Sequence, residues 1–121
     1  MSFDLAIMNT NAPISSEEAS QIYVGLCEGN YDLLPQSDRV QAFYEELIAA
    51  YPDIDSCSDD EIDKCPWSAG IDISDGAVVM SMVWSRAEEV ASFVMGWAEK
   101  HNLACYDPQA DKVYLPPTMI G

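Results

Sequence analysis

The chain has 121 residues, 49% of them hydrophobic, and carries 21 Asp and Glu against 5 Lys and Arg, for a net charge of −16. The length fits one domain over residues 1–121, and the apolar content with three tryptophans indicates a packed core rather than a disordered acidic tail. Such a charge repels nucleic acid and anionic membranes, so neither is an expected partner, whereas a basic protein is attracted.

The first half of the chain predicts one strand and two helices. Residues 3–8 show the alternation of a strand with one buried face. Ser15 and Glu18 have the spacing of a capping box at a helix start, and Gly29 is a natural stop. A second helix is expected to begin at Ser37 or Asp38 and to end before residue 52. Its apolar stripe consists of Val40, Phe43, Tyr44, Leu47 and Ile48.

The second half predicts a hairpin, a helix and two final strands. Asp75–Gly76 separates two strand-like runs and is typical of a hairpin turn. Ser85 with Glu88 reads as a second capping box, and the helix that follows has four expected inward positions: Val90, Phe93, Val94 and Trp97. Residues 103–106 and 112–115 resemble two strands.

The order β-α-α-β-β-α-β-β predicts an α+β fold. We expect about five strands in a mainly antiparallel or mixed sheet, with all three helices packed on one face.

Six acids crowd into the segment between Asp53 and Pro66, namely Asp53, Asp55, Asp59, Asp60, Glu61 and Asp63. Their mutual repulsion is relieved either by water, if the segment is simply a solvated surface, or by a partner rich in Lys and Arg. Trp67 follows the segment and has two alternative roles, as an anchor for such a partner or as a plug at the edge of the core. We take the six acids and Trp67 as the candidate partner-binding residues.

The sequence lacks a complete set of residues for the common catalytic mechanisms. His101 is the only histidine and falls near the expected end of a helix, where a structural cap is the simplest role. No nucleophile elbow, phosphate-binding glycine loop or zinc-protease motif occurs. The acidic segment departs from a calcium loop at Cys57, Ser58 and Lys64. We therefore expect no enzyme, no catalytic residues, no cofactor and no metal site.

The start of the chain does not resemble a signal peptide, and no apolar run is long enough for a membrane helix. Four cysteines at irregular spacings, Cys27, Cys57, Cys65 and Cys105, form no Cys-x-x-Cys pair. A cytoplasmic protein with reduced thiols is the expectation, with a Cys57–Cys65 pair under oxidation as an alternative.

Four short segments occur together along almost the whole chain: Ser2–Ile7, Pro66–Ser68, Trp84–Ser85 and Leu103–Gln109. In this respect the chain resembles a group of small, acidic bacterial proteins, some of which look like immunity proteins of toxin systems. The shared segments resemble a structural signature and carry no catalytic pattern. If the chain is an immunity protein, we expect its partner specificity in the acidic insertion around residues 59–63, which is peculiar to this chain.

Two functions remain open at this point. The first is an immunity protein whose acids occlude the basic cleft of a cognate toxin, such as a nuclease. The second is an intracellular small-molecule-binding or regulatory domain, with a pocket between sheet and helices lined by methionines and aromatic rings.

Overall fold

A computed structural model describes residues 3–10, 13–54 and 65–116 of the chain. The elements within these ranges are β1 (Phe3–Met8), α1 (Ser16–Cys27), the 3-10 helix η1 (Tyr31–Leu33), α2 (Asp38–Ala50), β2 (Asp72–Ile73), β3 (Ala77–Met82), α3 (Trp84–Lys100), β4 (Ala104–Asp107) and β5 (Lys112–Tyr114). The α+β class and the predicted order of strands and α-helices are confirmed.

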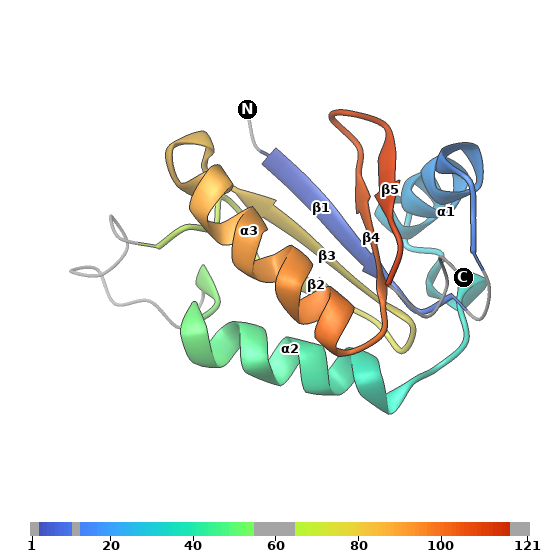
Figure 1. Ribbon diagram of the computed structural model, residues 1–121, viewed down its shortest axis with the longest axis horizontal. Coiled ribbons are helices and arrows are strands. Elements are labelled where there is room, and N and C mark those ends of the chain that lie inside the picture. The colour runs from blue at the N-terminus through green and yellow to red at the C-terminus, as the bar shows by residue number, and fades with distance from the viewer. Residues whose placement is uncertain (1–2, 11–12, 55–64, 117–121) are drawn as a thin grey trace.

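The five strands form one antiparallel sheet in the order β2-β3-β1-β4-β5. β1 is therefore central and runs between β3 and β4 (Figure 1). Its whole length pairs with β3, with Phe3 opposite Met82 and Met8 opposite Ala77. The predicted hairpin at Asp75–Gly76 joins β2 to β3, and the Ser74 N–H donates to the Ala77 carbonyl across the turn (2.9 Å).

The expectation that all helices cover one face of the sheet is wrong. Leu5 and Ile7 of β1 face the core under α2 and α3, whereas Ala6 and Met8 face a second cluster with α1. Figure 1 shows α3 in front of the sheet with α2 beside it, below in this view, and α1 at the other side of the β4–β5 hairpin. Four consecutive apolar residues, 5–8, are typical of a strand buried on both faces, and all four are fully buried here.

Two of the three predicted helix starts are confirmed. Ser15 and Glu18 form the capping box of α1, and Ser37 caps α2 by accepting a hydrogen bond from the Arg39 N–H (3.1 Å). The predicted box at Ser85 is wrong, because α3 begins at Trp84 and no side chain caps it. Hydrogen bonding of Val83 N–H to the Pro66 carbonyl (2.8 Å) instead fixes where the chain leaves β3.

The turn between β4 and β5 fastens to the central strand through Gln109. The Gln109 Oε1 accepts a hydrogen bond from the Asp4 N–H (2.6 Å), and its Nε2 donates to the Asp4 carbonyl (2.8 Å). The carboxylate of Asp107 caps the turn by accepting from the N–H groups of Gln109 and Ala110. The segment Leu103–Gln109 thus has a structural role in this chain.

Candidate functional site

Only two of the seven predicted partner-binding residues, Asp53 and Trp67, lie in the described part of the chain. The other five, Asp55, Asp59, Asp60, Glu61 and Asp63, lie outside it, and their role stays a prediction. Asp53 is partly buried, and its Oδ1 accepts hydrogen bonds from the N–H groups of Ile54 (2.7 Å) and Ile71 (3.2 Å). This carboxylate fastens the chain after α2 to the chain before β2.

Trp67 packs in the core, which corrects its assignment as a surface anchor. Its side chain is 2% exposed. The indole N–H lies 3.1 Å from the carbonyl oxygens of both Tyr51 and Pro52. Burial of a tryptophan stabilises a fold most when its carbon surface is covered and its single N–H donor has a hydrogen-bond acceptor. Trp67 meets both conditions. The alternative of a plug at the edge of the core describes Trp67.

Three other aromatic side chains gather at the surface above Trp67. The aromatic cluster consists of Tyr51, at the end of α2, and Phe93 and Trp97, one turn apart on α3. The rings of Phe93 and Trp97 stack with centroids 5.7 Å apart and an interplanar angle of 27°. The Tyr51 ring lies 6.3 Å from each of them and meets Trp67 edge-on. Phe93, predicted to face inward, is 53% exposed instead.

A carboxylate is held against the aromatic cluster. The Glu89 Oε2 accepts hydrogen bonds from the Tyr51 hydroxyl (3.2 Å) and from Nη2 of Arg86 (2.9 Å). These two bonds, with Arg86 the stronger cause, lower the pKa of Glu89. Burial, followed by the Glu89 bond, raises the pKa of Tyr51. The Tyr51 hydroxyl therefore stays protonated and donates, while Glu89 stays ionised and accepts.

A second charged contact joins α2 to the end of α3. Lys100 Nζ lies 2.9 Å from the Glu46 Oε2, and His101 Nε2 lies 3.4 Å from the Glu46 Oε1. Hydrogen bonding from Lys100 is the main cause that lowers the pKa of Glu46. His101 is the C-cap of α3, as predicted, and its ring meets Phe43 edge-on.

Each of the four basic side chains within the described ranges already contacts another group of the chain. Arg39 donates to the Asn9 Oδ1 (2.7 Å), Arg86 pairs with Glu89, and Lys100 pairs with Glu46. Lys112 lies over the Tyr114 ring, 5.3 Å from its centroid. By number alone, the 21 Asp and Glu of the sequence far exceed its 5 Lys and Arg.

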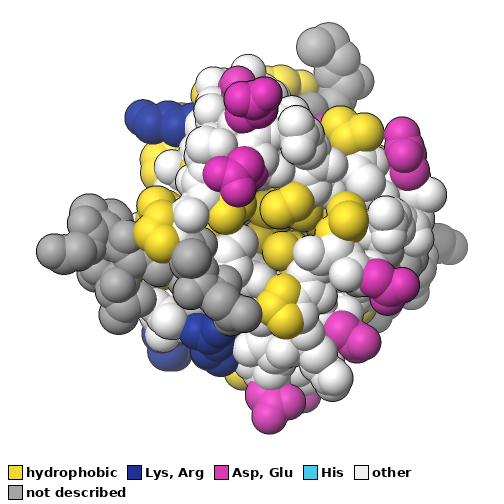
Figure 2. Space-filling model, turned by 90° about the vertical axis from the view of Figure 1, so that its right-hand side faces the viewer, with side chains coloured by type: hydrophobic (Ala, Val, Ile, Leu, Met, Phe, Trp, Pro, Cys, Tyr) yellow, Lys and Arg dark blue, Asp and Glu magenta, His cyan; other side chains and the backbone are white. Residues whose placement is uncertain are grey.

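The face formed by α1 and η1 shows this imbalance most clearly. No Lys or Arg occurs between residues 13 and 38, and Glu17, Glu18, Glu28 and Asp32 are all exposed there. In Figure 2, which views the side where α1 lies in Figure 1, hydrophobic side chains gather near the centre and acids lie around them. Val24 and Leu33 are the large exposed apolar side chains of these two elements.

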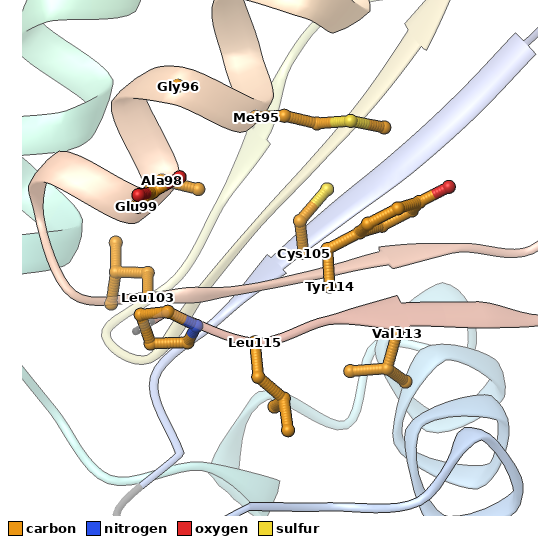
Figure 3. Close-up of a pocket in the computed structure, with 10 residues that line it drawn as sticks. Met95, Gly96, Ala98, Glu99, Leu103, Cys105, Val113, Tyr114 and Leu115 are labelled. Atoms are coloured by element: carbon orange, nitrogen blue, oxygen red, sulfur yellow. The ribbon is translucent and has the colours of Figure 1, made fainter. Parts of the chain in front are cut away.

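An apolar pocket of about 350 Å³ lies between α3 and the β4–β5 hairpin. Figure 3 shows Met95 extending from α3, with Cys105 and Tyr114 on the same side of the hairpin and Val113 and Leu115 pointing the other way. Burial raises the pKa of the Cys105 thiol to about 12, so the thiol stays protonated and unreactive at neutral pH. The pocket therefore offers packing surface rather than a nucleophile.

The described residues hold no group of three or more His, Cys, Asp or Glu placed to bind a metal ion. None of the described helices is long and apolar enough to cross a membrane. Cys27 is exposed, and Cys65 and Cys105 are buried thiols. The pairing considered for Cys57 involves a residue outside the described ranges.

No protein-family model, curated protein or solved structure matches this chain.

Sequence reasoning missed the aromatic cluster, although one signal for it was present. Glu89, Phe93 and Trp97 follow one another at intervals of four residues, so they form a single row along α3. That row runs beside the buried stripe of Val90 and Val94 rather than within it. The contact of this row with Tyr51 depends on where α2 ends. The periodicity of α3 cannot predict the end of another helix.

Proposed function

We propose that this chain is a non-enzymatic binding protein for a basic protein partner, and that the partner is a toxin which it neutralises. The inhibitor covers the basic cleft of the toxin and excludes the substrate. A nuclease fits this scheme best, because its cleft must attract phosphate and is therefore rich in Lys and Arg. The resemblance described above, to a group of small acidic bacterial proteins of which some look like immunity proteins, agrees with this proposal.

The charge balance carries this proposal. A surplus of carboxylates that has no counterpart within the protein repels itself, and a basic surface relieves the repulsion on binding. Complementary charge of this size also raises the rate of association, because the partner is steered before contact. Two of the four described basic side chains, Arg86 and Lys100, are paired with carboxylates, which reduces their repulsion of a basic partner.

The test is protection of living cells. Candidate toxins encoded by genes adjacent to the gene for this chain are expressed one at a time. Each toxin is expressed once alone and once together with this chain, in cells that the toxin alone kills. We expect survival with one of these toxins, and a complex of the purified pair whose association rate falls steeply as salt rises. Equal death with and without this chain, for every adjacent toxin, overturns the proposal.

The pocket favours a second candidate function, a small-molecule-binding domain. Its volume of about 350 Å³ is at the lower end of the range for ligand pockets, about 300–1,000 Å³. Met95, Leu103 and Cys105 offer an apolar wall, and Glu99 and Tyr114 add polar groups to the lining. A thermal-shift screen with metabolites tests this candidate: a reproducible rise in melting temperature supports it, and no response across a broad library contradicts it.

A further inference from the structure

We propose that the aromatic cluster, together with Glu89, receives an arginine side chain of the basic partner. This inference rests on the proposed function and adds the place and the chemistry of the contact. The aromatic cluster is formed by Tyr51, Phe93 and Trp97, which lie on α2 and α3. These helices cover the face of the sheet opposite to α1.

Phe93 is not needed to hold α3 on the sheet. The buried contacts of α3 are made by Ala87, Val90, Ala91, Val94 and Ala98. Phe93 lies outside this set and keeps 53% of its surface exposed. An exposed aromatic ring stacked on a second one is a preformed anchor, because little side-chain entropy is lost when a partner covers it. Trp and Tyr are also the residue types most enriched in binding hot spots.

The geometry fits a guanidinium group. A cation within about 6 Å of an aromatic centroid is attracted to the face of the ring, and a planar guanidinium also stacks on it. Glu89 is held beside the rings by the Tyr51 hydroxyl and already binds one guanidinium, that of Arg86. An ionised carboxylate has about four acceptor positions, so these two bonds do not saturate Glu89. Arginine uses both the ring faces and the carboxylate, whereas lysine lacks the planar fork.

Charge complementarity selects a basic occupant over an apolar or acidic one. The protein carries a net charge of −16, so an acidic partner is repelled from every side. In the proposal, this overall negative charge attracts the partner and the aromatic cluster slows its release.

The experiment uses two peptides as probes, one of alternating Gly and Arg and one of alternating Gly and Lys, with binding measured by fluorescence anisotropy at low salt. We expect wild-type protein to bind the arginine peptide more tightly. Phe93→Ala should weaken that binding about tenfold or more, as loss of a hot-spot residue does. The matched control is Val24→Ala, because Val24 is 51% exposed but lies on α1. Its binding should change by less than about twofold.

Since Phe93 is exposed, both variants should remain folded, and circular dichroism with thermal melting checks this. A folded Phe93→Ala protein that binds the arginine peptide as tightly as wild type overturns the inference. Equal affinity of wild type for the two peptides also overturns it, because the rings then make no distinction between guanidinium and ammonium.

Cell protection separates this inference from the proposed function. If wild type and Phe93→Ala protect cells from the toxin equally well, the aromatic cluster is not the contact, and the proposed function stands. If wild type protects no cell, the proposed function is wrong, whatever the peptides do. We expect protection by wild type and Val24→Ala, and weaker protection by Phe93→Ala at limiting expression.

Discussion

Replacing Gly76 with alanine should destabilise the fold, because the chain passes too close to it for a methyl group. Gly76 is buried at the turn before β3. A Cβ atom at this position would lie 2.7 Å from the Pro35 carbonyl oxygen, 2.8 Å from the Leu34 carbonyl oxygen and 2.7 Å from the Leu34 Cβ. Two of these three atoms belong to the backbone, so a side-chain rotation does not relieve the clash.

The expected cost follows from what has to move. Overpacking of one methyl group costs about 1–3 kcal/mol. Displacement of residues 34–35 also disturbs the hydrogen bond from Nδ2 of Asn9 to the Pro35 carbonyl (2.9 Å), which is worth about 1 kcal/mol. Together these give a loss of about 2–4 kcal/mol. For a domain of this size, that is a fall in melting temperature of about 8–15 °C.

Gly96→Ala is the matched control, since the same methyl group meets no atom within 4 Å there. Gly96 lies inside α3, where alanine is favoured over glycine by up to about 1 kcal/mol. The two variants should therefore change stability in opposite directions in urea denaturation and calorimetry. If Gly76→Ala is as stable as wild type, the close approach of residues 34–35 to this turn is not what restricts the position.

Two further predictions concern the β4–β5 hairpin. Gln109→Ala should lower the free energy of unfolding by about 1–2 kcal/mol in urea denaturation, because it removes the hydrogen bonds to Asp4 and Asp107. The control is Gln41→Ala on the exposed side of α2, which should change the free energy of unfolding by less than about 0.5 kcal/mol. Stability should also fall as pH rises from about 9 towards 12, since the Cys105 thiol keeps its proton in the fold but loses it in the unfolded chain. At pH 10 the ionisation of Cys105 in the unfolded chain should lower the free energy of unfolding by about 1.4 kcal/mol. The free energy of unfolding of Cys105→Ala should therefore fall less steeply with pH than that of wild type. Equal pH dependence of the two proteins contradicts the raised pKa of Cys105.

The sequence predicted local structure well where the signal is local. Ser15 with Glu18 and the Asp75–Gly76 turn each act within a few residues, and the structure has both as expected. The start of α3 depended instead on a distant partner, because the Pro66 carbonyl accepts from Val83. The local sequence pattern at Ser85 could not predict that long-range hydrogen bond.

The placement of helices on the sheet failed for a related reason. Periodicity shows which side of a helix is apolar but not which face of the sheet it meets. The fully apolar run of residues 5–8 in β1 was the available sign of cover on both faces. At the candidate site, the apolar character of Trp67 and Phe93 was equally clear in both, yet Trp67 is buried and Phe93 is exposed. The Trp67 indole reaches the Tyr51 and Pro52 carbonyls within the core, whereas Phe93 lies beside the buried stripe of α3. Tertiary packing decides both positions.

The central place of β1 has a consequence for synthesis on the ribosome. β1 pairs with β3 and β4, whose residues are translated long after its own. Until then Leu5–Met8, the most apolar stretch of the strand, has neither neighbour to hydrogen-bond with. The sheet is therefore expected to form only after β4 has been made, and a nascent chain stalled before β4 would expose this strand to chaperones or aggregation.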